Sequence, residues 1–185
     1  MNKVVKLATI LLLICAIVAG ILGVVNAITE DTIAQRQAEK EKEAYASVLA
    51  ADVYEPQEFD AEAYPTVTNV VKAGDAGYVV KSTFSGAQGS ITMAVGVDND
   101  FRCTGISIID HSETSGLGAV AAASSEKGVA FREQFVGQDE TIALTRQGGS
   151  IDALTGATIT SDAIVGAVEV SISVVKSVAE GGIAA

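Results

Sequence analysis

A short stretch near the C-terminal end of the sequence combines hydroxyl groups, a carboxylate and small residues in a pattern that could hold a phosphate. Asp152, Thr155, Gly156, Ala157 and Thr158 follow a double glycine and precede a long apolar run that predicts a helix. Gly156 and Ala157 leave the backbone open, so a bulky group can approach the Thr158 hydroxyl. A helix N-terminus offers free N–H groups and the positive end of a dipole, which suits an anion. An ordinary N-cap loop accounts for the same hydroxyls, and the residues alone favour that simpler interpretation.

A second stretch, Asp110 to Gly118, is polar and rich in glycine, and it follows an apolar run typical of a strand. Its glycines permit close approach of the backbone to a ligand, and Glu113 and Thr114 could hydrogen-bond a polar ring edge. A surface loop with a capping hydroxyl explains the pattern equally well. His111 stands two positions before Glu113, but such neighbours in a loop need not face each other. We therefore predict no acid–base pair here, and no catalytic residue elsewhere in the chain.

Composition and charge exclude several classes of function. Ten basic and 23 acidic residues follow position 29, which gives that part of the chain a net charge of −13. Such a charge repels nucleic acid, so no nucleic-acid partner is expected. Two cysteines and one histidine are too few for a disulfide scaffold or a metal cluster, and we predict no metal site. Cys103 lies in a strand-like run and is most simply a small buried hydrophobe.

The N-terminal segment is long and apolar enough to cross a membrane. Leu7 to Ile28 contains 22 residues without a charge, and a helix of that length rises about 33 Å, against a hydrocarbon core of about 30 Å. Lys3 and Lys6 flank one end, whereas Glu30 and Asp31 flank the other. Because basic flanks stay in the cytoplasm, we expect a single-pass protein of the cytoplasmic membrane with everything after residue 29 outside.

A cleaved signal peptide is the alternative interpretation of this segment, because Val25-Asn26-Ala27 resembles a cleavage site. The apolar run is longer than an ordinary signal core, which favours an uncleaved anchor.

The remaining sequence predicts an α+β fold. Residues 29–49 read as a helix continuing out of the bilayer, and 50–65, which hold both prolines, read as a linker or a loop lying against the domain. Runs with period-two alternation and turn residues between them indicate four strands, and two later stretches indicate helices. The strands are Val67–Ala73, Gly77–Phe84, Ser90–Val97 and Cys103–Asp110, and the helices are Ser125–Val136 and Thr160–Val178. We therefore expect a transmembrane anchor at 1–28, a stalk helix and linker at 29–65, and a ligand-binding domain at 66–185.

The two polar motifs, in this order behind one membrane helix, resemble those of the G subunit of the Rnf complex. That complex is an ion-pumping ferredoxin:NAD⁺ oxidoreductase of bacteria and archaea. The family's flavin attachment motif is Asp, two free positions, Ser or Thr, Gly, Ala, Thr, and residues 152–158 match every fixed position. Its second signature is Glu-Thr-Pro-Gly-Leu-Gly. Here Glu113, Thr114, Gly116, Leu117 and Gly118 match it, and Ser115 replaces the proline.

The resemblance implies FMN esterified through its phosphate to Thr158, with the remaining matched residues of both motifs around the cofactor. It implies an FMN-binding domain outside the cytoplasm and an electron carrier within a translocase, without turnover of its own. The implied partners are the other membrane and peripheral subunits of the Rnf complex, membrane lipid, and a flavin transferase that uses FAD and a divalent metal. The C subunit of the sodium-pumping NADH:quinone reductase, more distantly similar, is one alternative, and a non-redox exported binding protein is another.

Overall fold

The computed structural model describes residues 3–181, which divide into two compact units between Lys40 and Glu41. Helix α1 (Lys3–Val48) makes up the described part of the first unit and ends in the second. The membrane helix and the stalk helix predicted from the sequence are thus one continuous helix. The second unit begins within the predicted stalk and includes the predicted linker. Because no independent observation tests the functional boundaries at 28 and 65, they stay predictions.

Two of the described helices are long and apolar enough to cross a membrane, α1 and α3 (Thr158–Ala179). The apolar part of α1 has no side chain buried in the protein, whereas 56% of the corresponding window of α3 is buried. The helix α3 is therefore the core helix of the folded unit, and α1 is the candidate for a membrane span.

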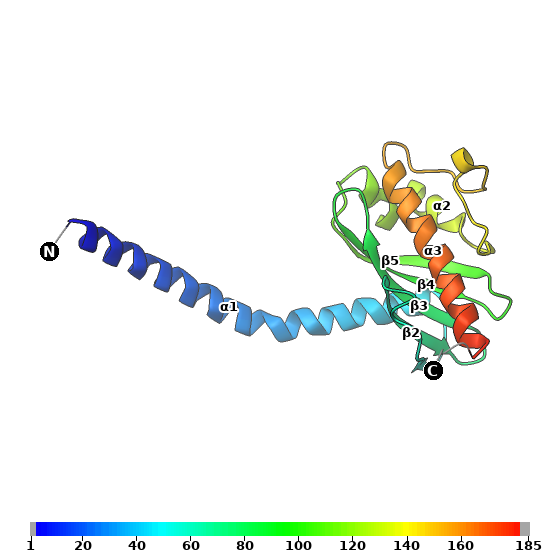
Figure 1. Ribbon diagram of the computed structural model, residues 1–185, viewed down its shortest axis with the longest axis horizontal. Helices are drawn as coiled ribbons and strands as arrows, with labels where there is room; N and C mark the ends of the chain where they lie inside the picture. The colour runs from blue at the N-terminus through cyan, green and yellow to red at the C-terminus, as the bar shows by residue number, and fades with distance from the viewer. Residues whose placement is uncertain (1–2, 182–185) are drawn as a thin grey trace. The chain divides into compact units, whose positions relative to one another are not determined.

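An antiparallel sheet of five strands in sequence order forms the centre of the second unit (Figure 1). The strands are β1 (Tyr54–Pro56), β2 (Val67–Ala73), β3 (Tyr78–Ser85), β4 (Ser90–Val97) and β5 (Cys103–His111). The α+β fold class is as predicted, and the four predicted strands are present within one residue at each end. The short edge strand β1 lies in the segment predicted as a linker or loop. Its terminal Pro56 is tolerated because an edge strand has one side without ladder bonds.

One face of the sheet packs against α3, which crosses it in orange in Figure 1. Apolar residues of alternating strand positions, such as Val80 and Val95, meet Ile164, Val168 and Ile172 of α3 in one buried cluster. The short helix α2 (Glu126–Glu133) contributes Phe131 to the same cluster. The sequence placed this helix at Ser125–Val136, and Ser125 is in fact its N-cap, accepting a hydrogen bond from Gly128 N.

The opposite face of the sheet receives the end of α1, residues 41–48. Ala44, Tyr45 and Val48 are buried there in a second cluster with residues of β2, β3 and β4. Gly96 makes this approach possible, because a Cβ atom at that position would lie 2.7 Å from the Val48 carbonyl oxygen. The same carbonyl accepts a 2.6 Å hydrogen bond from Thr104 Oγ1, so the end of the helix keeps its last acceptor satisfied.

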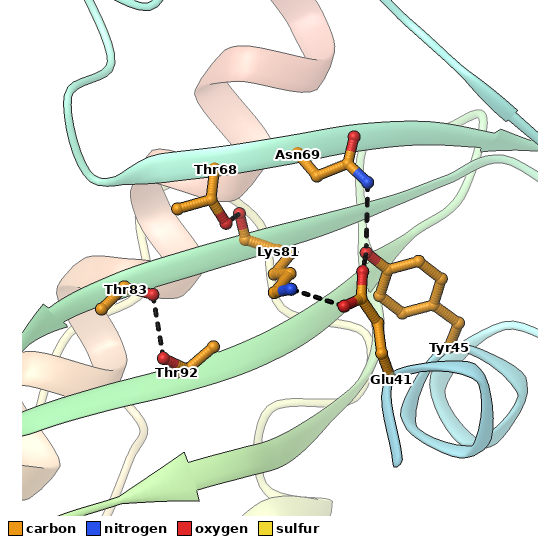
Figure 2. Close-up of polar contacts among 7 residues, drawn as sticks. All are labelled: Glu41, Tyr45, Thr68, Asn69, Lys81, Thr83 and Thr92. Atoms are coloured by element: carbon orange, nitrogen blue, oxygen red, sulfur yellow. Dashed lines mark hydrogen bonds and ion pairs between the residues drawn. The ribbon is translucent and has the colours of Figure 1, made fainter. Parts of the chain in front are cut away.

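A polar network joins this end of α1 to the sheet (Figure 2). Lys81 Nζ lies 2.5 Å from Glu41 Oε2, and the Tyr45 hydroxyl donates to Glu41 Oε1 at 2.7 Å. Asn69 donates to the Tyr45 oxygen at 3.5 Å. Burial alone would raise the pKa of Glu41, but its hydrogen bonds to Lys81 and Tyr45 and the lysine charge bring the pKa below its ordinary value. Burial, together with the Glu41 carboxylate, raises the pKa of Tyr45.

We predict that Glu41→Gln lowers the stability of the folded unit by about 1 kcal/mol, because the ion pair is three-quarters shielded from solvent. The folded pKa of Glu41 is depressed, so its contribution is complete above the unfolded pKa and is lost as pH falls through the folded pKa. Urea unfolding of the full chain in detergent, followed by tyrosine fluorescence, should therefore separate wild type from variant at neutral pH and bring them together in acid. If the difference in unfolding free energy between wild type and variant stayed the same below the folded pKa of Glu41, this account would be wrong.

Candidate functional site

The predicted phosphate-binding loop leads directly into α3, which begins at Thr158, two residues before the start expected from the sequence. The N-cap residue is Ala157, and no side chain caps the helix. Ser161, in the first turn of α3, folds the loop: its Oγ accepts from Leu154 N and donates to Ala157 O, both at 3.0 Å. If the hydroxyls near this helix start served only to cap the helix, one of them would bond a free N–H of the first turn of α3. No side chain does so.

Three threonines near this helix start differ in what their hydroxyls can do. Thr160 is buried, 1% exposed, and donates a 2.6 Å hydrogen bond to Glu113 Oε2. Thr155 is exposed in the loop, and Thr158 is half-buried at the first position of the helix. Within the described residues 3–181 the Thr158 side chain has no hydrogen-bond partner. Thr160 is therefore committed to the protein's own structure, whereas Thr158 combines access with a helix N-terminus.

Glu113 holds three separate segments of the chain together. Besides the bond from Thr160, its carboxylate accepts one from Gln88 N at 3.1 Å, in the β3–β4 turn. Gly118 packs against the same carboxylate, since a Cβ atom there would lie 2.2 Å from Glu113 Oε2. Burial would raise the pKa of Glu113, but the hydrogen bonds from Thr160, Gln88 and Ala87 bring it below its ordinary value. The structure thus gives Glu113 partners within the chain, and its predicted contact with a cofactor stays a prediction.

The loop from Thr114 to Gly118 lies directly against the loop that precedes α3. Leu117 is 45% exposed, and its Cδ2 atom would lie 3.1 Å from a Cβ atom placed on Gly156. Gly156 has φ +77°, a left-handed conformation that glycine adopts without strain. Leu117 N donates to Thr114 O at 3.2 Å, which closes the turn around Ser115 in the absence of the family's proline. The two polar motifs found in the sequence are therefore neighbours in space.

A groove of about 320 Å³ runs between these two loops and α2. The Thr114–Gly118 loop and the residues after it form one wall, residues 152–155 form another, and α2 lies between them. Its lining consists of Gly116, Leu117, Val120, Lys127, Ala130, Phe131, Gln134, Asp152, Ala153, Leu154 and Thr155. The lining is largely apolar with a few polar groups, the usual character of a small-ligand site, and its volume is at the lower end of such sites.

On the other side of Leu117 lies a smaller cavity of about 90 Å³. The remaining predicted site residues of both motifs, except Thr158, line this cavity. Its lining is Ala87, Gln88, Glu113, Thr114, Leu117, Gly118, Gly156, Ala157 and Thr160. That volume accommodates about three waters, each occupying about 30 Å³, and no tricyclic ring.

Residues predicted from the sequence thus line both hollows, but seven that line the groove were not predicted. Ala153 and Leu154 occupy the free positions of the attachment motif, Val120 follows the Glu113–Gly118 loop, and the other four lie elsewhere in the chain. Lys127, Ala130, Phe131 and Gln134 all come from α2 or its C-cap, which the sequence indicated only as a short helix. No local motif marks them, because their role depends on where α2 packs. Among residues 3–181 no three His, Cys, Asp or Glu side chains gather as metal ligands. Cys103 is buried, and burial raises the pKa of its thiol to about 12, as suits an inert core residue.

Known proteins resemble this chain along most of its length. Residues 1–48 match the RnfG N-terminal region and residues 86–173 match the FMN-binding domain. The G subunit of an ion-translocating oxidoreductase complex from Methanosarcina acetivorans is 36% identical, covering 95% of this chain and 96% of its own. The chain belongs to the RnfG family.

Two further members of this family show the same likeness. The G subunit of the Na⁺-translocating ferredoxin:NAD⁺ oxidoreductase complex of Acetobacterium woodii is 32% identical over 95% of this chain and 93% of its own. The G subunit of an ion-translocating oxidoreductase complex from Yersinia pestis is also 32% identical, over 86% and 84%. The resemblance inferred from the two motifs is confirmed. This RnfG homologue is an electron-transfer subunit with an FMN-binding domain, and its family and apolar α1 indicate a membrane protein with other Rnf subunits as partners.

In this RnfG homologue we predict that Glu113→Gln lowers the stability of the folded unit by about 1–2 kcal/mol, because a neutral amide cannot replace both charge-assisted acceptors. The amide exchange of Gln88 should also accelerate, since its acceptor is the Glu113 carboxylate. Hydrogen exchange read by mass spectrometry on the full chain measures both effects. Glu58→Gln, at an exposed position outside the site, serves as the control. Equal protection of residues 86–90 from hydrogen exchange in the two variants would show that Glu113 does not hold the β3–β4 turn in place.

Proposed function

We propose that this chain carries FMN esterified through its phosphate to Thr158, and that it serves as an electron carrier in an ion-translocating ferredoxin:NAD⁺ oxidoreductase complex. The observation that carries the proposal is the Thr158 hydroxyl. It stands at the first residue of an α3 terminus that no side chain caps, three positions after Thr155, which lines the groove, while the Thr160 hydroxyl is occupied by Glu113. A phosphate at this position would meet the positive end of the helix dipole and its free N–H groups.

The groove that residues 152–155 line, just before Thr158 in the chain, suits a flavin ring. The apolar side chains of the groove, such as Val120, Phe131 and Leu154, match the apolar face of an isoalloxazine, and Lys127, Asp152 and Thr155 supply polar groups for its heteroatom edge. Leu117 and the backbone at Gly116 would cover the ring from water. Thr114, Gly118, Gly156 and Ala157 shape the adjoining cavity, with Glu113 holding it closed. These residues, with Thr158, make up the proposed cofactor site.

Attachment would require a separate enzyme, because a threonine hydroxyl is too weak an acid to attack a phosphoanhydride unaided. In the proposed reaction, the Thr158 Oγ forms a bond to the phosphorus of the FMN half of FAD. The pyrophosphate P–O bond breaks, AMP leaves, and the hydroxyl proton passes to the transferase or to water. A divalent metal bound with FAD would neutralise the phosphates. The chain contributes the nucleophile and its placement.

Once attached, the flavin supplies the redox chemistry, and the chain supplies position and electrostatics. Among the described residues that line the groove, there is no nucleophile–base pair that would indicate turnover of a substrate. The proposed role is therefore electron transfer between cofactors of neighbouring subunits. The match to the RnfG N-terminal region favours this role over that of the related quinone-reductase C subunit, and the FMN-binding domain speaks against a non-redox binding protein.

We predict that Thr158→Val abolishes covalent FMN and leaves the domain folded, because valine keeps the shape and removes the attacking oxygen. The chain should be produced together with a flavin transferase and examined by in-gel fluorescence after denaturation and by intact mass. The variant should be lighter than the mature wild type by one FMN increment in addition to the change of side chain. Thr145→Val, at an exposed threonine outside both motifs and both hollows, is the matched control and should retain the flavin. Covalent flavin on the Thr158 variant would move the acceptor to another hydroxyl.

We further propose that residues 1–28 anchor the chain in the cytoplasmic membrane as a single pass, surrounded by lipid and other subunits. Residues 29–65 would form the stalk and linker, and 66–185 the flavin domain. The charges support an N-terminus in the cytoplasm, with Lys3 and Lys6 at one end of the apolar run and Glu30 and Asp31 at the other.

A reporter enzyme that is active only outside the cytoplasm, fused after Ala185, should therefore be active. Exchanging the flanking charges, with Lys3 and Lys6 changed to Glu and Glu30 and Asp31 to Lys, should reduce its activity. A cytoplasmic reporter that is active at the same fusion point of the unaltered chain would reverse the proposed topology.

A further inference from the structure

The C-terminal end of α2 holds two different segments of the chain through side-chain bonds to backbone atoms. Arg132 Nη1 donates to the carbonyl oxygens of Ala121 and Ala123, at 2.6 and 2.9 Å. The Gln134 side chain accepts a hydrogen bond from Asp152 N at 2.7 Å and donates one to Asp152 O at 3.4 Å. One turn of the chain therefore fixes the backbone on both sides of the groove.

The segments that are fixed in this way are the two walls of the proposed flavin site. Ala121 lies in the short 3-10 helix Gly118–Ala122, which continues from the Glu113–Gly118 loop. Asp152 is the first residue of the attachment motif. Gly128 on α2 brings the first wall close, since a Cβ atom there would lie 2.4 Å from the Val120 carbonyl oxygen. The position of α2 thus determines the spacing between the walls.

The attachment loop depends on few contacts. Its downstream end is held by Ser161 and by the start of α3, as described above. Its upstream end follows the bridge between Leu144 and Ile151, and Gly148 and Gly149 lie between those two residues. Between Ile151 and Leu154 the backbone hydrogen bonds to the Gln134 side chain are the ones that tie residue 152 to the rest of the described fold. Without them, an exposed loop would have to be ordered when the transferase binds, at a cost in affinity.

We propose that Gln134 is a positioning residue for flavin attachment. It holds Asp152, and with it the segment leading to Thr158, in the conformation that the flavin transferase recognises. This inference rests on the proposed function of Thr158. Gln134 lies on the groove but acts through the backbone of Asp152, so its loss should weaken recognition of the acceptor and leave the chemical step intact.

The test compares Gln134→Leu with Gln134→Glu in the full chain, purified in detergent without flavin. Leucine removes both hydrogen bonds at similar size, whereas glutamate keeps an oxygen for the 2.7 Å bond from Asp152 N. Gln57→Leu is the matched control, because the Gln57 side chain also bonds backbone carbonyls, those of Glu55 and Pro56, but lies on no wall of the groove. If the leucine variant does not fold, Gln134→Asn, which keeps the amide but shortens its reach, takes its place.

Two measurements are made on each variant. Hydrogen exchange of residues 152–158 reports the order of the loop without any flavin. Initial rates of covalent flavin transfer from FAD, with purified transferase and Mg²⁺ and with the acceptor chain varied, give KM and kcat. We expect Gln134→Leu to exchange faster at residue 152 and to raise KM roughly tenfold, the effect of about one hydrogen bond, with kcat within about twofold. Gln134→Glu should restore both values, and Gln57→Leu should match wild type.

Wild-type exchange and KM in Gln134→Leu would overturn the inference. A loss confined to kcat, or equal losses in the leucine, glutamate and Gln57 variants, would overturn it as well, because positioning through Asp152 predicts neither. Failure of the proposed function has a different signature: the wild-type chain accepts no flavin or Thr158→Val still does, whatever the exchange of the loop.

Discussion

The carboxylate of Glu113 is the contact on which the geometry of the site depends. It joins the β3–β4 turn, the loop after β5 and the first turn of α3, which lie far apart in the sequence. A charged acceptor makes these bonds stronger than neutral ones, and glycines at 86 and 118 give it the room to sit between the segments. The same bond occupies Thr160, whereas the Thr158 hydroxyl, the proposed acceptor, has no hydrogen-bond partner among the described residues.

Two rigid attachments therefore define the groove, one on each side of Leu117. Glu113 fixes the beginning of the Glu113–Gly118 loop to α3, and α2 fixes the residues after that loop and the start of the attachment motif through Arg132 and Gln134. A cofactor held by one covalent bond through its phosphate could still move its ring. At the proposed site, preformed walls would limit that freedom and would fix the electrostatic surroundings that set the ring's redox behaviour.

The sequence predicted those parts of the fold that depend on local patterns. The strands were found because alternation and turn residues mark them within a few positions. The helix α3 was found as a long apolar stretch, and α2 as a short stretch that carries Phe131 and Phe135. The strand β1 was missed because three residues ending in Pro56 carry no alternation. The partners of Glu113 and Gln134 could not be predicted, since they lie 47 and 18 positions away and depend on how the helices pack. Thr158 was predicted as the flavin acceptor from a motif, and that role stays a prediction. The difference between its unpaired hydroxyl and the bonded hydroxyl of Thr160 could be seen only in the packed structure.

The two faces of the sheet serve different purposes, which separates stability from flavin chemistry in this chain. One face carries α3 and, at the N-terminal start of that helix, the proposed cofactor site; the other receives residues 41–48 through an apolar cluster and the Glu41–Lys81 pair. Because β3 and β4 contribute alternate residues to both faces, a rigid sheet connects the two without sharing side chains between them. Val80 faces α3 while its neighbour Lys81 binds Glu41. Substitutions can therefore alter the attachment of residues 41–48 to the sheet without changing the side chains around the proposed flavin site.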